Sequence, residues 1–139
     1  MSITDPYSQY LENQVKTATP GKLLIMTFDA AIRFGRTAHE RMKEGKLDEQ
    51  SANIGKLQNV LLELMSSLDA KVDRQLAANL DSLYTYMFDR LTQANIRDDV
   101  RALEEVIQIL TELRSVWAEA DLAARSGGQT LGTQERKAA

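Results

Sequence analysis

The two prolines of this 139-residue chain, Pro6 and Pro20, both lie near its start. Proline removes a backbone donor and clashes with the preceding helical turn, so its absence after Pro20 leaves the rest of the chain free to form long helices. Apolar residues in this stretch recur at steps of three and four, as in Ile54, Leu57 and Leu61, which places them along one face of a helix. No strand-like alternation stands out, and the sequence therefore predicts an all-α fold.

Capping signals and apolar stripes divide the chain into four long predicted helices. Thr19 can cap a helix that begins at Pro20, because proline at the first helical position gives up only an unpartnered N–H. Gly45 ends this helix at about Lys43. The predicted helices cover about 20–43, 48–68, 73–94 and the stretch from 98 or 99 onward.

The later helix ends are predicted from single residues. Asn95 is expected to adopt the left-handed conformation that ends a helix, and Asp98 or Asp99 is expected to cap the last helix. The third helix is expected to bury one stripe, formed by Leu76, Leu80, Leu83, Met87 and Leu91.

Short connections between helices of this length favour antiparallel neighbours around one core. We therefore expect an antiparallel four-helix bundle over residues 19–125, with residues 1–18 as an N-terminal arm or short helix packed over a hydrophobic groove. From Ser126 the sequence Ser-Gly-Gly-Gln-Thr-Leu-Gly-Thr is typical of a linker, so residues 126–139 are expected to form a flexible tail.

The composition excludes several classes of protein. There is no cysteine, so a disulfide scaffold, a cysteine-based zinc site and a thiol nucleophile are ruled out. The 17 Lys+Arg against 20 Asp+Glu give a net charge of −3, without the basic footprint of a nucleic-acid binder. No apolar run approaches the ~20 residues that span a bilayer, and the opening lacks the pattern of a secretory signal. We expect a cytoplasmic domain without a cofactor, a nucleic-acid partner or membrane insertion.

The stripes do not account for all of the apolar residues. Between Leu23 and Phe34 they cover most of the circumference of the first long helix, which must then be covered on every side. One interpretation is that the N-terminal arm covers this helix through Tyr7, Tyr10 and Leu11. The other is a groove for an amphipathic partner helix, and both hold if the arm occupies the groove until a partner displaces it. The candidate groove residues are Ile25, Phe28, Ile32, Ile54, Val60, Leu61, Ile107 and Val116, with Gln58 and Tyr84 as polar candidates for fixing the partner's backbone.

No combination of residues indicates an active site, so we expect a protein that is not an enzyme. His39 is the only histidine, without a second nitrogen or a carboxylate cluster to form a metal site. One alternative is a phosphotransfer bundle that uses His39, although Lys43 and Gly45 match the usual His-x-x-Lys-Gly spacing only loosely. Another is an oligomerisation module that uses the surplus apolar surface on a second copy of itself.

Six motifs occur in order along the chain: Pro6-Tyr7-Ser8-Gln9-Tyr10, Thr17-Ala18-Thr19-Pro20-Gly21, Lys56-x-Gln58-Asn59, Leu83-Tyr84-x-Tyr86-Met87, Ala94-Asn95-Ile96 and Arg114-x-x-Trp117. Taken together and in this order, they resemble the FliS family of bacterial flagellar secretion chaperones. The similarity runs from about Asp5 to Leu122. The family usually has an acidic residue where this chain has Lys22, and often a large apolar residue where it has Gly55.

The resemblance implies an antiparallel helical bundle whose N-terminal segment can lie over a hydrophobic surface. It also implies a partner, the C-terminal helical region of flagellin, bound 1:1 in the cytosol so that flagellin does not polymerise before export. An export-gate component, a co-chaperone or a flagellar regulator is a further candidate partner. The physical basis would be competition for apolar surface, since the bundle would bury the same stripe that flagellin buries against itself in the filament.

Overall fold

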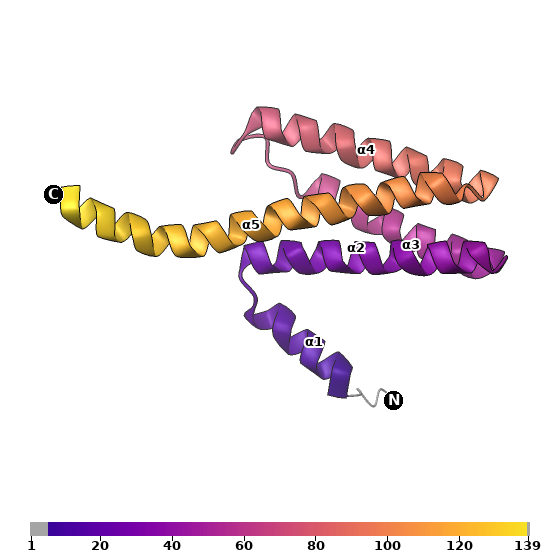
Figure 1. The fold of residues 1–139 in the computed structure, drawn as a ribbon, viewed down its shortest axis with the longest axis horizontal. Coiled ribbons are helices and arrows are strands. Elements are labelled where there is room, and N and C mark those ends of the chain that lie inside the picture. Colours follow the sequence, from indigo (N-terminus) through magenta and orange to yellow (C-terminus); the bar gives the residue numbers. More distant parts are fainter. Residues whose placement is uncertain (1–5, 139) are drawn as a thin grey trace. The chain divides into compact units, whose positions relative to one another are not determined.

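The computed structural model describes residues 6–138, without the side chains of Tyr7, Thr17 and 127–138. All of the regular structure in this range is helical, as predicted (Figure 1). The helices are α1 (Pro6–Thr17), α2 (Pro20–Lys43), α3 (Leu47–Ser66), α4 (Arg74–Arg97) and α5 (Val100–Ala138).

The chain divides into two compact units. The bundle unit is Thr27–Leu113, and the terminal unit consists of the residues up to Met26 together with those from Arg114 onward. The terminal unit thus contains α1, the start of α2 and the later part of α5. No helix among residues 6–138 is long and apolar enough to cross a membrane.

The start signals for α2, α4 and α5 act as local chemistry predicts. The Oγ1 of Thr19 accepts a hydrogen bond from the amide of Lys22 at 3.2 Å, which confirms the predicted cap of α2. The Oδ1 of Asp73 accepts from the amide of Leu76 at 3.0 Å at the start of α4. Of the two caps proposed for α5, Asp99 has this role, because its Oδ1 accepts from the amide of Ala102 at 3.1 Å.

The predicted left-handed conformation at Asn95 is wrong. Asn95 lies within α4, which ends at Arg97, and the left-handed residue that caps its end is Asp98, with φ 52°. The short Asp side chain tolerates this conformation as Asn does. The side chain of Asn95 instead accepts hydrogen bonds from α3, at 3.2 Å from Gln50 Nε2 and 3.1 Å from Ser51 Oγ.

Amide side chains fix the register of α3 against α4. The Nε2 of Gln50, which is buried, also donates to Asp98 Oδ1 at 2.9 Å. Two turns further along α3, the Nε2 of Gln58 donates to the carbonyl of Phe88 at 3.2 Å and to Thr92 Oγ1 at 2.9 Å. A rising number on α3 is matched by a falling number on α4, so the two helices are antiparallel. We call this set of hydrogen bonds the amide seam.

The core of the bundle unit is built from the predicted stripes, with two differences on α4. Leu80, Met87 and Leu91 are buried as expected, whereas Leu76 is 45% exposed. Tyr84, rather than its neighbour Leu83, completes the buried face. Burial raises the pKa of the Tyr84 hydroxyl, because the charged phenolate would lose its hydration. The other buried apolar side chains on α3 and α5 include Ile54, Leu57, Leu61, Leu64, Leu103, Val106 and Leu110.

A polar cluster joins α4 to α5 on the surface. The hydroxyl of Tyr86 donates to Glu105 Oε1 at 2.7 Å, and Arg90 Nε donates to the same oxygen at 3.0 Å. The hydrogen bond from Tyr86, followed by that from Arg90, lowers the pKa of Glu105.

Helices α2 and α5 approach closely at Gly35. A methyl group added there would lie 3.0 Å from Ile107 Cγ1 and 3.5 Å from Leu57 Cδ2. A glycine inside a helix costs roughly 0.5–1 kcal/mol relative to alanine. At Gly35 this cost is accompanied by tight packing, because an added methyl group would require Ile107 to shift.

The backbone of the C-terminal residues differs from the expected linker, since α5 continues as a helix to Ala138. The segment from Ser126 contains three glycines but no proline, so nothing in it forbids helical geometry. The flexibility of 126–139 stays a prediction.

Candidate functional site

Most of the candidate groove residues on α2, α3 and α4 lie in the interior. Ile25 is 8% exposed and Ile32 6%, so a partner can reach them only if neighbouring side chains move. Their part in binding remains a prediction, and in this structure they act as core residues. The buried candidates are Ile25, Phe28, Ile32, Ile54, Leu61 and Tyr84.

Two of the remaining candidates on α3 and α5 are half-buried. Val60 and Ile107 each retain part of their surface, and Ile107 lines a cleft. Gln58 is also partly accessible, but its amide is occupied by the amide seam, so binding a partner's backbone through Nε2 would break that seam.

The most accessible candidates belong to the terminal unit. Tyr10 is 56% exposed and Val116 58%, and Leu11 is also exposed. The side chain of Tyr7 lies outside the described residues. The sequence predicted either an arm or a short helix at the N-terminus, and the structure has a helix there, α1. The packing of this segment over a groove stays a prediction.

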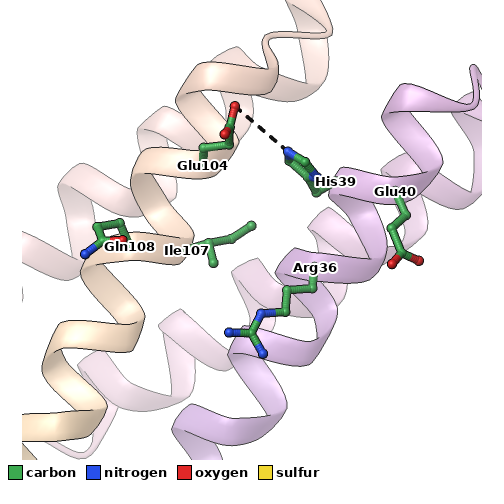
Figure 2. Close-up of a pocket in the computed structure, with 6 residues that line it drawn as sticks. All are labelled: Arg36, His39, Glu40, Glu104, Ile107 and Gln108. Carbon is green, nitrogen blue, oxygen red and sulfur yellow. Dashed lines mark ion pairs between the residues drawn. The ribbon is translucent and has the colours of Figure 1, made fainter.

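The α2–α5 cleft of the bundle unit encloses about 380 Å³ (Figure 2). Ile107 points from α5 into the space between the helices, and His39 and Glu104 face one another across it. The carboxylate of Glu40 is turned away from α5. The lining residues are Arg36, His39, Glu40, Glu104, Ile107 and Gln108.

The geometry of His39 does not favour a phosphotransfer role. Its Nε2 is buried and has no hydrogen-bond partner among the described residues, and it lies 3.9 Å from the nearer carboxylate oxygen of Glu104. A phosphoryl acceptor must present a nitrogen to its donor, and this nitrogen is covered. The part of the chain that the structure describes also holds no group of three or more His, Cys, Asp or Glu side chains able to hold a metal ion.

A second cleft, of about 430 Å³, lies entirely within the terminal unit. It is formed by the first turns of α2 and the later part of α5, and its lining is apolar except for Trp117 and Asp121. We call it the Trp117 cleft. Its lining residues are Pro20, Gly21, Leu24, Trp117, Ala120, Asp121 and Ala124.

Two polar side chains of the Trp117 cleft differ in how they are satisfied. The carboxylate of Asp121 lies against Gly21, so a methyl group added at Gly21 would overlap it. The same carboxylate forms an ion pair with Arg125, in which Oδ2 of Asp121 lies 3.2 Å from Nη2 of Arg125. A carboxylate beside the first turn of α2 complements the positive end of that helix. The indole Nε1 of Trp117, in contrast, is buried without an acceptor among the described residues.

Several large apolar side chains of this unit are exposed, as are others on the bundle unit, among them Val72 and Ile96. Leu23 adjoins Leu24 of the cleft in sequence, and Val116 adjoins Trp117. Large exposed apolar surfaces are typical of binding sites. The exposed apolar residues of the terminal unit include Tyr10, Leu11, Val15, Leu23, Val116 and Leu122.

The sequence indicated part of this site and missed the rest. Tyr10, Leu11 and Val116 were candidates, whereas Leu23 was counted only among the surplus apolar residues and Trp117 was named only in the motif Arg114-x-x-Trp117. The unsatisfied N–H of Trp117 has no local signal, because it depends on which atoms of α2 lie nearby.

Comparison with known proteins gives consistent matches over most of the chain. The family described as "Flagellar protein FliS" matches residues 3–124. A flagellar secretion chaperone FliS from Bacillus subtilis (strain 168) is 36% identical over 120 residues, which cover 86% of this chain and 89% of the relative. The FliS of Escherichia coli (strain K12) is 33% identical over 122 residues, covering 86% and 90%.

A solved structure supports the fold alone. The crystal structure of a flagellar chaperone from bacteria aligns with a TM-score of 0.69 and 22% sequence identity. The alignment covers 82% of this chain and 93% of that one.

Proposed function

Because the chain belongs to the FliS family, whose curated relatives are flagellar secretion chaperones, we propose that it binds the C-terminal helical region of flagellin. In this proposal one chain holds one flagellin in the cytosol, keeps it from polymerising and presents it for export. An export-gate component, a co-chaperone or a flagellar regulator is a further candidate partner of the complex. The protein acts by binding alone, without a catalytic step.

The observation that carries this proposal is the exposed apolar surface of the terminal unit. Tyr10, Val15 and Val116 each leave half or more of their surface in water, and the Trp117 cleft adds an apolar hollow. Burial of apolar area is worth roughly 25 cal/mol per Å² removed from water. A client with an apolar helical stripe would bury that stripe on this surface and so gain the free energy that it otherwise gains by packing against another flagellin.

The proposed mode of binding also explains how such a complex can be released. A client segment that orders on binding loses conformational entropy, often 2–5 kcal/mol or more, which offsets much of the gain from burial. The complex can therefore be specific without being permanent.

A reconstitution with purified components tests the proposal. The chain is mixed with a C-terminal fragment of flagellin from the same organism, and with an N-terminal fragment as the control. Size-exclusion chromatography with light scattering should show a 1:1 complex with the C-terminal fragment alone, and full-length flagellin should polymerise more slowly in the presence of the chain. A C-terminal fragment that does not co-elute, together with an unchanged polymerisation rate, contradicts the proposal.

Light scattering of the isolated chain addresses the oligomerisation alternative in the same experiment. A mass equal to that of the monomer at all concentrations excludes a module that buries this surface against a second copy.

A further inference from the structure

The buried side chains of this protein are divided unequally between its two compact units. Of the apolar side chains that are buried in the described part of the chain, Ile25 alone belongs to the terminal unit, and all of the others belong to the bundle unit. Burial of apolar surface is the main favourable contribution to folding, so the bundle unit has a core of its own and the terminal unit has little. Regions with few buried apolar contacts open more readily than the core of the same protein.

Trp117 weakens the packed form of the terminal unit further. Its indole N–H can donate a hydrogen bond but cannot accept one. In the structure Nε1 is out of contact with water and has no acceptor among the described residues. If the terminal unit opened, water would accept this hydrogen bond, so the buried donor favours the open form.

One close contact opposes this opening, because it joins α5 to the first turn of α2 within the terminal unit. The side chain of Asp121 is only 12% exposed, and its carboxylate pairs with Arg125 and lies directly against Gly21. Glycine leaves room for the carboxylate there, since a methyl group at this position would overlap it. The negative charge also complements the positive end of α2. We call the contact between Asp121 and Gly21 the Asp121 clasp.

We propose that the terminal unit opens and closes as a separate part of the fold, held closed by the Asp121 clasp, while the core of the bundle unit stays intact. Helices α2 and α5 pass through both units, so opening separates their ends in the terminal unit and leaves 27–43 and 100–113 packed in the bundle unit. The opening uncovers Trp117 together with Ile25, the buried groove candidate of this unit. It is a property of the free chain and does not depend on the identity of the client.

The single tryptophan of the chain lies in the terminal unit, so its fluorescence reports on that unit, whereas circular dichroism reports on helix throughout the chain. The full chain is unfolded with urea and followed by both signals. The midpoint of the fluorescence change is expected at a lower urea concentration than the main loss of helix, because the terminal unit opens first. Coincident transitions are typical of a single cooperative unit and would overturn the proposal.

Hydrogen exchange of the full chain without denaturant locates the opening. Amides of 114–125 in α5 are compared with those of 54–64 in α3, a helical segment of the bundle unit. After correction for intrinsic rates, 114–125 is expected to exchange about tenfold faster or more. Residues 22–26 of α2 should open with the same free energy as 114–125, because the two segments belong to one unit. Equal protection of 114–125 and 54–64, or a graded series typical of a fraying helix end, contradicts the proposal.

Two matched glycine substitutions test the Asp121 clasp. Gly21→Ala adds a methyl group that collides with Asp121, whereas Gly55→Ala adds the same group where it meets no heavy atom within 4 Å. Overpacking at Gly21 predicts that exchange in 114–125 becomes about fivefold faster or more, while Gly55→Ala leaves that segment unchanged. Once Asp121→Ala has removed the carboxylate, adding Gly21→Ala should cause no further increase. Equal exchange of 114–125 in Gly21→Ala and Gly55→Ala would overturn the proposal that the clasp holds the terminal unit closed.

Discussion

Gly35 and Gly55 lie inside neighbouring helices. Replacement by alanine is expected to stabilise the protein at Gly55, where space is free, but not at Gly35, where the added methyl group is crowded. A methyl group at Gly55 in α3 would meet no heavy atom within 4 Å. The substitution removes the conformational freedom that glycine has in the unfolded chain and adds no contact. We expect Gly55→Ala to stabilise the protein by about 0.5–1 kcal/mol, which corresponds to an increase in Tm of roughly 2–4 °C.

Gly35→Ala brings the same gain in helix propensity but adds a steric cost. Its methyl group would lie 3.0 Å from Ile107 Cγ1, closer than such carbon atoms normally approach, so α2 or Ile107 has to move. Overpacking of this kind costs typically 1–3 kcal/mol. The propensity term is common to both variants, so Gly35→Ala should be less stable than Gly55→Ala by about 1–3 kcal/mol.

Chemical denaturation of the two variants and the parent chain, followed by circular dichroism, measures these differences. The denaturant dependence should be unchanged, because each variant exposes the same surface on unfolding. Ile107→Ala removes the atom that causes the clash, so in a double-mutant cycle it should recover much of the loss caused by Gly35→Ala. Equal stabilities for Gly35→Ala and Gly55→Ala, or no coupling between Gly35 and Ile107, would refute the argument from close packing.

Three other changes have definite expected outcomes. Ile54→Asp should unfold the bundle, because it places an unpaired carboxylate at a fully buried position; a circular dichroism spectrum of unchanged helix content would show that this position is not in the core. Tyr86→Phe removes a donor that holds the pKa of Glu105 below its ordinary value. The stability from that shift is present above the ordinary pKa and is lost as the pH falls through the lowered one, so the variant should lose less stability in acid; an unchanged slope of unfolding free energy against pH speaks against it. Deletion of residues 1–15 should increase the binding of a hydrophobic dye if the arm covers apolar surface, and unchanged dye fluorescence would contradict that function of the arm.

The helices could be predicted from the sequence because the signals that start and end them are local. Thr19 and Pro20 set the beginning of α2, and Gly45, with φ 72°, follows its end. Such signals need only a few neighbouring residues, which the sequence places together. The cap of α4 at Asp98 was not predicted, because Asn and Asp side chains both tolerate the left-handed conformation and no local signal separated Asp98 from the expected Asn95.

The groove was harder to predict, since periodicity shows which residues share a face but not which face is buried. Phe28 and Ile54 lie on apolar stripes and were equally suited to a core or to a binding surface. On α4, the choice between Leu83 and Tyr84 depended on the rotation of the helix, which its partners set. Which side chains of the terminal unit are exposed could not be predicted from the sequence, because their exposure depends on how α2 and α5 pack in that unit.

The amide seam has a consequence for a protein whose proposed client is itself helical. A carrier made of apolar helices risks exchanging one of its own helices for that of its cargo. If an apolar helix replaced α4, the amide of Gln50 would lose its acceptors Asn95 and Asp98 inside the protein, at about 1–3 kcal/mol for a stranded donor. Gln58 would lose its own acceptors on α4 in the same way. If the proposed client binds, these polar pairs would therefore disfavour its exchange with α4.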